Sequence, residues 1–314
     1  MSSTVSDSAF ALRRAHFPDE MTFHAPGLKH FKTSEYVQQN AVRFVSISVT
    51  GTDCALACEH CKMQVLRGMT ALPRFDGSLY DLCCELAERG ARGMLISGGC
   101  DRRGRVPLLR HIPDLIRARR ELDFTIRVHP GLPDEETISG LAEIGIDGAM
   151  VDIIGDEATI REVYHLDATV ADYETVLRHL EDYRVPAVPH IILGLHFGQM
   201  RGEWTALEMI ARHARKFLVL VVLMPLTGTP MINLTPPPIA QIAHFFALAR
   251  GVLPDTSVML GCARPLGQIK ADIDRAAVDA GLNGIAYPAE GIIAYAQARG
   301  LTPKFVDACC GVNW

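Results

Sequence analysis

Eight short apolar runs alternate with amphipathic segments along most of this chain. Each run has five to seven residues, and the segments between them have the apolar spacing of helices. Strands that alternate with helices favour right-handed βαβ units and a parallel sheet. We therefore expect an α/β fold, a (β/α)8 TIM-type barrel, with its active site at the carboxyl ends of the strands. The predicted strands are 43–49, 93–97, 124–128, 148–154, 187–193, 217–223, 256–261 and 284–288.

The length of 314 residues agrees with one such barrel and a short extension at each end. We expect an irregular N-terminal arm over residues 1–40 and the barrel over 41–300. Residues 301–314 then form a cysteine-containing tail that follows the last helix.

Composition excludes several classes of protein. The net charge of -5 favours neither a nucleic acid nor an anionic membrane as partner. The first residues lack a signal-peptide pattern, and no apolar run approaches the roughly 18 residues of a membrane span. The nine cysteines are odd in number and clustered, which favours metal or redox chemistry over a disulfide framework. These features predict a cytoplasmic protein.

Three of these cysteines lie in the stretch "TDCALACEHC", residues 52–61, just beyond the first predicted strand. Cys54, Cys58 and Cys61 have the spacing C-x3-C-x2-C, which allows successive sulfurs to reach different irons of a [4Fe–4S] cluster and leaves the fourth iron open. A structural zinc site usually has a fourth ligand, and His60 is too close to Cys61 in sequence to serve easily. Zinc and unliganded buried cysteines remain the alternatives.

This motif, after the first strand of a parallel barrel, resembles that of the radical S-adenosylmethionine superfamily. The resemblance implies that Cys54, Cys58 and Cys61 hold a catalytic [4Fe–4S] cluster. S-adenosyl-L-methionine would chelate the open iron, and its reductive cleavage would give a 5'-deoxyadenosyl radical.

Other stretches resemble the cofactor-binding segments of that superfamily. "SGGC" stands where the family has a GGE-type motif, with a cysteine in place of the glutamate, and glycine allows close backbone approach. "VDIIGD" would supply a ribose ligand, "ILGLHFG" would lie near adenine, and a histidine of the cysteine motif would pack on adenine. "TIRVHPG" would contact a carboxylate or nucleotide, or would form a salt-bridged rim instead. The implied cofactor-binding residues are His60, Ser97, Gly98, Gly99, Arg127, Asp152, Leu193 and Gly194.

Six further cysteines divide by position. Cys83 and Cys84 lie in a helical segment and are expected to be structural, because free buried cysteine behaves as a small hydrophobic residue. The other four predict an auxiliary [4Fe–4S] cluster, since two follow strands and two lie on a tail that could fold over the same mouth. The alternative is two core thiols and a frayed tail. The four candidate ligands are Cys100, Cys262, Cys309 and Cys310.

The stretches "SVTGTDCALACEHCK", "SGGCD", "RVHPGL" and "LGCARPLG" most resemble a biotin-synthase-like subunit of the two-protein, archaeal-type lipoyl synthase. That resemblance implies sulfur insertion into a protein-bound octanoyl chain. It also implies three partners: an octanoylated lipoyl-carrier protein, a paralogous radical S-adenosylmethionine protein and a low-potential electron donor such as ferredoxin. The alternatives are another enzyme of this group acting on a small molecule, as a maturase or methyltransferase, and a non-catalytic iron–sulfur protein.

Seven arginines lie within residues 102–120. A basic segment of this kind would steer an acidic carrier domain. A solvated helix face is the alternative interpretation.

Overall fold

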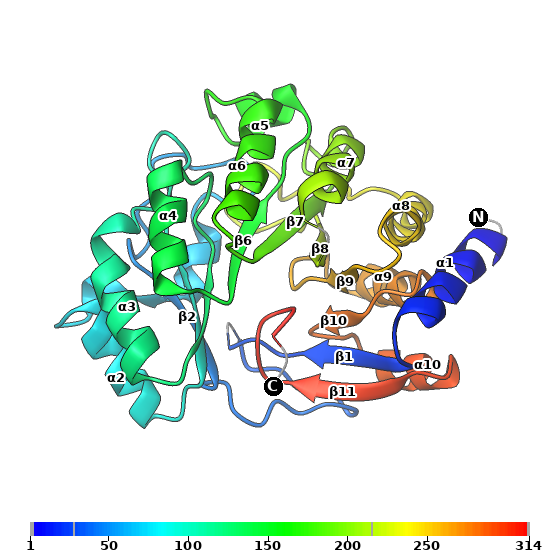
Figure 1. The fold of residues 1–314 in the computed structure, drawn as a ribbon. Helices are drawn as coiled ribbons and strands as arrows, with labels where there is room; N and C mark the ends of the chain where they lie inside the picture. Colours follow the sequence, from blue (N-terminus) through cyan, green and yellow to red (C-terminus); the bar gives the residue numbers. More distant parts are fainter. Residues whose placement is uncertain (1–2, 28, 215, 313–314) are drawn as a thin grey trace.

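All eight predicted strands are present, and each pairs in parallel with the next along the chain. The computed structural model describes residues 3–27, 29–214 and 216–312. Figure 1 shows that the strands form one curved sheet, which confirms the predicted α/β barrel fold. The eight strands are β2 (Phe44–Ser48), β4 (Gly93–Ser97), β5 (Thr125–Val128), β6 (Gly148–Asp152), β7 (Ala187–Leu193), β8 (Phe217–Val222), β9 (Ser257–Leu260) and β10 (Gly284–Ala286).

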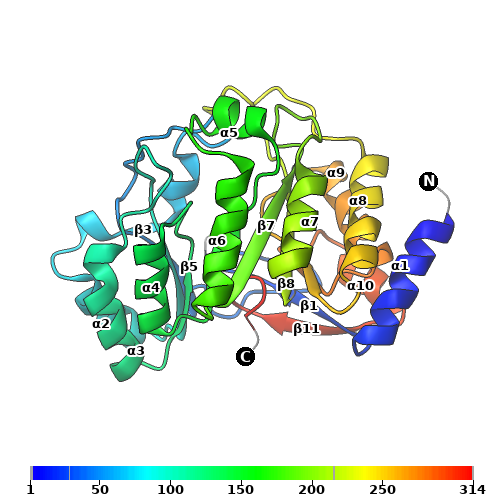
Figure 2. The same cartoon turned by 45° about the horizontal axis from the view of Figure 1, so that its top comes forward.

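Helices lie along the outside of the sheet (Figure 2) and bury their apolar faces against it. Local sequence begins several of them, because Ser78, Asp134 and Asp156 each accept a hydrogen bond from a backbone N–H of the first turn. Among the described residues, no helix has the length and apolarity needed to cross a membrane. The helices are α2 (Leu79–Glu88), α3 (Ile112–Glu121), α4 (Glu135–Ile144), α5 (Glu157–Val163), α6 (Val170–Asp182), α7 (Glu203–His213), α8 (Ile239–Val252), α9 (Gln268–Asp279) and α10 (Ile292–Ala298).

Short elements complete the connections. After β2 the chain forms three minor elements before α2, and one more 3-10 turn precedes α3. They are η1 (Gln64–Gly68), β3 (Thr70–Ala71), η2 (Leu72–Arg74) and η3 (Leu109–His111).

Both ends of the chain are more ordered than the sequence predicts. The first 40 residues hold a helix and a strand, α1 (Ser3–His16) and β1 (Glu20–His24), and the expected tail begins with strand β11 (Thr302–Val306). β1 pairs with both β10 and β11, which makes β11 an edge of the sheet. The sequence signal is weak because both strands contain several polar residues, and β11 also contains a proline, which edge strands tolerate.

The two ends of the sheet approach each other through backbone and tail contacts. The strand order runs from β11 and β1 to β2 and β3. The backbone N–H of Gly27, beyond β1, donates to the carbonyl of Phe44 in β2 at 3.2 Å. A Cβ at Gly27 would lie 2.2 Å from the Ala41 carbonyl oxygen, so this contact requires glycine. The tail after β11, red near the centre of Figure 1, packs its apolar side chains against Phe44, and these are Ala308, Cys309 and Val312.

The carboxylate of Asp307 anchors this tail to the N-terminal segment. Its two oxygens accept hydrogen bonds from the Tyr36 hydroxyl at 2.7 Å and from the backbone N–H groups of Gln39 and Asn40 at 2.9 and 3.0 Å. The predicted tail is therefore held against the N-terminal segment, and its two cysteines are buried.

Candidate functional site: a cavity with two groups of cysteines

A cavity of about 370 Å³ opens at the carboxyl ends of the strands. Its volume lies in the range of small-molecule sites. Seven of the nine cysteines line it: Cys54, Cys58, Cys61, Cys100, Cys262, Cys309 and Cys310. Most of the other lining side chains are aliphatic or methionine, among them Leu56, Met63, Leu66, Met69, Leu95, Val106, Met150, Ile192, Val219, Val221 and Leu223.

Cys54, Cys58 and Cys61, here called the first cysteine group, lie on a tightly curled loop after β2. The backbone at Ala57 and Lys62 has positive φ angles of 46° and 39°, which turn the loop on itself. The Lys62 ammonium donates to the Ala57 carbonyl at 2.7 Å and pairs with Glu59, fixing the curl from inside. The loop is thus a preformed holder for three thiols.

Contacts with the end of α5 fix this loop on the barrel. The Glu59 N–H donates to the carbonyl of Val163, and the Glu59 carboxylate lies 2.8 Å from Nε2 of His165. The Cys58 side chain packs in the same apolar cluster as Tyr164. A hydrogen bond between the thiols of Cys58 and Cys61 lowers the pKa of Cys61 to about 7 and raises that of Cys58.

The "SGGC" segment after β4 lies directly against the first cysteine group. A Cβ at Gly99 would lie 1.9 Å from the Asp53 carbonyl oxygen and 2.5 Å from the Cys54 Cβ, so only glycine fits. The Gly99 N–H donates to the Thr50 hydroxyl at 2.7 Å. Ser97, Gly98 and Gly99 all line the cavity, where the sequence placed them as cofactor-binding residues.

Polar side chains interrupt the apolar cavity wall at the ends of β5 and β6. His129 Nε2 lies 3.6 Å from Oδ1 of Asp152, and the Tyr164 hydroxyl lies 3.4 Å from Oδ2. Burial raises the pKa of the Asp152 carboxyl, but the hydrogen bond and charge of His129 outweigh it and bring this pKa to about 2. Burial lowers the pKa of His129, yet the Asp152 partner raises it overall. The pair therefore favours imidazolium and carboxylate.

Two further cavity residues lie beside this pair. The ring of His190, on β7, lies 6.1 Å from that of His129 between centroids, and burial lowers the pKa of His190 to about 4. His190 was not predicted from the sequence, although a histidine inside the apolar run "AVPHIIL" was a usable signal. The His60 ring, the predicted adenine contact, lines the cavity with its centroid 5.2 Å from that of Tyr164.

Leu193 and Gly194, also predicted near adenine, lie at the end of β7 but are not among the residues that line the cavity. Gly194 has a φ of +77°, and its N–H donates to the buried carboxylate of Glu203 at 2.8 Å. The other carboxylate oxygen accepts from the Arg201 N–H at 2.6 Å. Glu203 thus shapes this loop, and no sequence motif identified it.

Cys262, Cys309 and Cys310 lie together on the cavity wall and are here called the second cysteine group. Ala263, the residue after Cys262, packs against the apolar cluster that contains Cys310, and Cys309 is the residue before Cys310. Burial raises the pKa of all three thiols. Cys100 lies instead against the first cysteine group, because it packs on the same apolar cluster as Cys54 and Cys61. The structure therefore brings together three of the four predicted auxiliary ligands.

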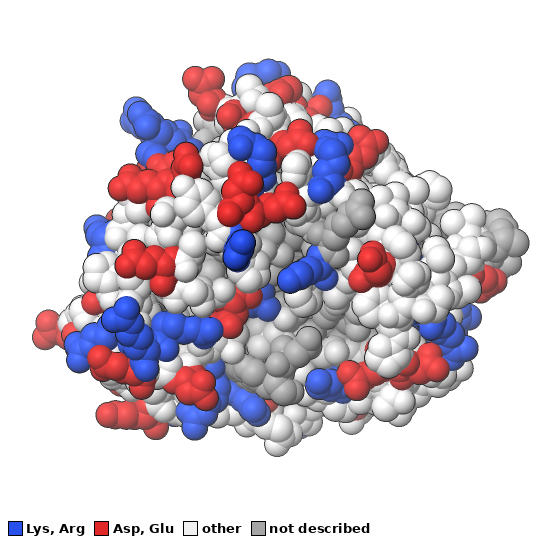
Figure 3. Space-filling view, viewed as in Figure 1, with Lys and Arg blue, Asp and Glu red and all other residues white. Residues whose placement is uncertain are grey.

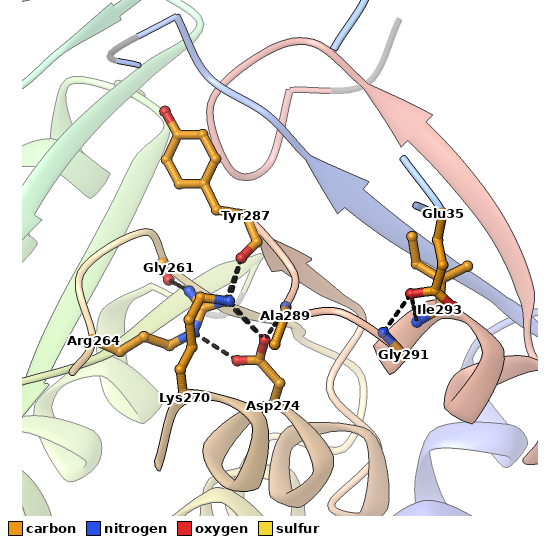
Figure 4. Close-up of polar contacts among 9 residues, drawn as sticks. All are labelled: Glu35, Gly261, Arg264, Lys270, Asp274, Tyr287, Ala289, Gly291 and Ile293. Carbon is orange, nitrogen blue, oxygen red and sulfur yellow. Dashed lines mark hydrogen bonds and ion pairs between the residues drawn. The ribbon is translucent and has the colours of Figure 1, made fainter. Parts of the chain in front are cut away.

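A buried ion pair fixes the loop that carries Cys262 (Figure 4). The guanidinium of Arg264 donates to both carboxylate oxygens of Asp274, at 2.6 and 3.1 Å, and to the carbonyls of Gly261 and Tyr287. Lys270 also contacts Asp274 and the Tyr287 carbonyl. These contacts join the ends of β9 and β10, so Arg264 serves to position Cys262.

The other residues of interest lie outside the cavity lining. Arg127 was predicted to bind cofactor, but its guanidinium is buried in the barrel interior and donates to the Gly311 carbonyl. Cys83 is fully buried in α2 against Met94, as expected for a structural cysteine.

The residues present fit the cofactors that the sequence implies. The first cysteine group supplies three thiols on the wall of a cavity large enough for a small cofactor. In the described part of the chain, no three His, Cys, Asp or Glu side chains are arranged to hold a single metal ion. The ligands of an iron–sulfur cluster differ from such a set because they bind separate irons.

The arginines of residues 102–120 fall into two sets. Arg105, Arg117 and Arg119 pair with carboxylates, although Arg117 and Arg119 are exposed. No ion pair is seen within the described ranges for the other four, which are also exposed: Arg102, Arg103, Arg110 and Arg120. On the face in Figure 3, basic and acidic side chains are intermixed.

Comparison with known proteins gives structural similarity alone. No protein-family model and no curated protein sequence matches the chain. Methylornithine synthase (PylB) aligns with a TM-score of 0.61 and 13% identity over 96% of this chain and 89% of that chain. The FeFe-hydrogenase maturase HydG from Carboxydothermus hydrogenoformans gives 0.61 and 14% over 97% and 72%. SuiB from Streptococcus suis, solved with bound S-adenosylmethionine, gives 0.53 and 10% over 74% and 52%. The chain therefore has the fold of radical S-adenosylmethionine enzymes.

Proposed function

We propose that this protein is a radical S-adenosylmethionine enzyme that inserts sulfur into an aliphatic carbon, as one partner of a two-protein lipoyl synthase. One observation carries the proposal: a single, largely apolar cavity has two separate cysteine groups on its walls. The first group lies on the preformed loop after β2, where the cysteine motif predicts a cofactor site. The second lies on the loop after β9 and on the tail.

Some residues of the cavity would bind the cofactors, and others would accept and orient the substrate. When bound to the first cysteine group, a [4Fe–4S] cluster with S-adenosyl-L-methionine would supply a 5'-deoxyadenosyl radical. Ser97, Gly98 and Gly99 would allow close approach of the methionyl end, and Asp152 and His60 would contact the nucleoside. The aliphatic lining excludes water and accepts an octanoyl chain, as the burial of apolar surface requires.

The second cysteine group would hold the sulfur-donating cluster. Cys262 is fixed by the Arg264–Asp274 pair, and Cys309 and Cys310 by the anchored tail. The partner proteins inferred from the sequence, an octanoylated carrier, a paralogous radical enzyme and a low-potential donor such as ferredoxin, belong to this proposal.

The deciding experiment is anaerobic incubation of the reconstituted protein with reductant, S-adenosyl-L-methionine and an octanoyl-lysine peptide, with and without the paralogous partner. We expect 5'-deoxyadenosine by chromatography and a thiolated peptide by mass spectrometry. A variant with Cys262 and Cys310 changed to Ala should form 5'-deoxyadenosine without thiolation. Absence of thiolated peptide in every combination would overturn the sulfur-insertion proposal.

A second candidate is a radical enzyme acting on a small polar molecule. The His129–Asp152 pair and His190 favour it, because they place hydrogen-bonding groups inside an otherwise apolar cavity. 5'-Deoxyadenosine formation that does not depend on the octanoyl peptide, with no thiolated product, would support this candidate. A chain that forms no 5'-deoxyadenosine at all would be a non-catalytic iron–sulfur protein.

A further inference from the structure

Arg127 is a buried cation whose hydrogen-bonding capacity is mostly unused. It lies on β5, one inward-facing position below His129, and is 5% exposed. Its Nη2 donates to the Gly311 carbonyl at 2.7 Å, while Nε and Nη1 are buried with no hydrogen-bond partner among the described residues. A buried charge left without partners destabilises a folded chain.

The surroundings of Arg127 leave space for the guanidinium without neutralising it. A Cβ at Gly148, on the neighbouring strand β6, would lie 2.0 Å from Nη1, so glycine makes room there. The Phe217 ring lies 5.9 Å from the guanidinium carbon. Buried Arg250 differs, since its three nitrogens donate to backbone carbonyls and to an asparagine.

The second cysteine group is where the charge of Arg127 acts. The Gly311 carbonyl that accepts from the guanidinium belongs to the residue directly after Cys310, and both tail cysteines are buried. Asp147 is the other acidic group that acts on Arg127, but its carboxylate is already engaged by Arg119 and the Ile126 N–H. The unsatisfied cation therefore lies beside the two cysteines of the tail.

We propose that Arg127 is the fixed counter-charge of the anionic sulfur group held by the second cysteine group. The inference rests on the proposed function, under which that group is an iron–sulfur cluster with thiolate ligands. A permanent positive charge in a buried site stabilises the more negative, reduced state of such a group, and hydrogen bonds from the unused nitrogens would act in the same direction. Arg127 is then a positioning residue. Its uncompensated charge destabilises the metal-free chain, and the anionic sulfur group offsets this destabilisation when it is bound.

The first test uses the full-length chain with Cys54, Cys58 and Cys61 changed to Ala, so that only the second group is loaded. Iron content and the midpoint potential by redox titration are compared for Arg127, Arg127→Lys, Arg127→Gln and Arg127→Met. We expect the Gln and Met variants to have a midpoint potential about 59 mV more negative than the parent. For a one-electron couple this corresponds to an oxidised-to-reduced ratio about tenfold higher at a fixed potential. The Lys variant should stay near the parent.

The Gln variant separates charge from tethering, because its amide can still donate to the Gly311 carbonyl without carrying charge. Equal potentials in Gln and parent would mean that Arg127 only tethers the tail, and would overturn the inference. If the triple variant with Arg127 intact binds no iron, the proposed function fails at its second cluster, which is a different result from iron with an unshifted potential.

Thermal unfolding of the metal-free and the reconstituted chain gives a second readout. In the metal-free chain, Arg127→Met should unfold at the same temperature as the parent or higher, because it removes an uncompensated charge, whereas reconstitution should stabilise the parent more than the variant. Arg250→Met is the matched control and should lower the unfolding temperature in both states, since it loses satisfied hydrogen bonds. A marked loss of stability in metal-free Arg127→Met would contradict the counter-charge role.

Discussion

The backbone N–H of Cys100 donates to the sulfur of Cys54 at 3.3 Å. The donor is main chain, so the bond does not depend on the Cys100 side chain. It joins the segment after β4 to the first cysteine group, and hydrogen bonds of this kind tune metal-bound thiolates.

Cys54→Ala and Cys100→Ala should therefore behave differently. The first change removes a cluster ligand and should abolish both iron at the first group and 5'-deoxyadenosine formation. The second keeps the hydrogen bond and should retain most of both, as well as the iron of the second group. Iron analysis and chromatography check this, with Cys83→Ala as the control in α2. Loss of one cluster in Cys100→Ala would instead make Cys100 a ligand.

Gly99→Ala should damage the site by steric overlap with Asp53 and Cys54. Overpacking of this kind costs about 1–3 kcal/mol, and the displaced loop should bind less iron. Gly251→Ala in α8 is the control, because its added Cβ meets no atom within 4 Å. It should stabilise the chain by about 0.5–1 kcal/mol. Urea unfolding and iron content measure both effects, and unchanged iron in Gly99→Ala would argue against a close approach.

Asp307→Ala should release the tail. The change removes three hydrogen bonds to a carboxylate and should cost about 3 kcal/mol in the free energy of unfolding. Tyr36→Phe removes one of them and should cost about 1 kcal/mol. The same two changes can be made in the variant with Cys54, Cys58 and Cys61 changed to Ala, which can load only the second group. There, Asp307→Ala should lower the bound iron more than Tyr36→Phe does. Equal iron in the two variants would show that the anchor does not position Cys309 and Cys310.

Buried His24 should lower the free energy of unfolding at acidic pH. Burial lowers its pKa to about 4 from an ordinary value near 6.5, so the folded chain keeps it neutral while the unfolded chain takes up a proton. His24 therefore does not lower the free energy of unfolding above pH 6.5. As the pH falls from 6.5 towards 4, this free energy should fall by about 3 kcal/mol. His24→Leu should flatten that part of the curve of unfolding free energy against pH. Parallel curves for variant and parent would rule out this origin.

The exposed arginines that form no ion pair with a described residue provide a test of carrier docking. Changing Arg102, Arg103 and Arg120 to Glu should slow turnover on whole carrier protein more than on a short peptide, and added salt should narrow the difference. Arg117→Glu with Arg119→Glu breaks ion pairs to Glu121 and Asp147 and should mainly lower stability. Equal losses on both substrates would identify the segment as a solvated helix face.

The sequence predicted the strands of the barrel because β2 and β4–β10 form its wall and are strongly apolar. It missed β1 and β11, since Glu20 and Thr22 in β1 and Thr302, Pro303 and Lys304 in β11 interrupt the apolar pattern. The first cysteine group is local in sequence and was recognisable from spacing. The second depends on contacts between residues about 50 positions apart. The hydrogen-bond partner of Arg127, the Gly311 carbonyl, is 184 positions away, and no local pattern encodes it.

Pairing of β1 with β11 joins segments almost 300 residues apart. Closing so long a loop adds little to the equilibrium cost, which grows only with the logarithm of length, but contacts of this separation form slowly. During synthesis the walls of the cavity leave the ribosome before the tail does. We therefore expect the tail to enter a barrel that is already largely folded, so that Cys309 and Cys310 arrive as the last step of maturation.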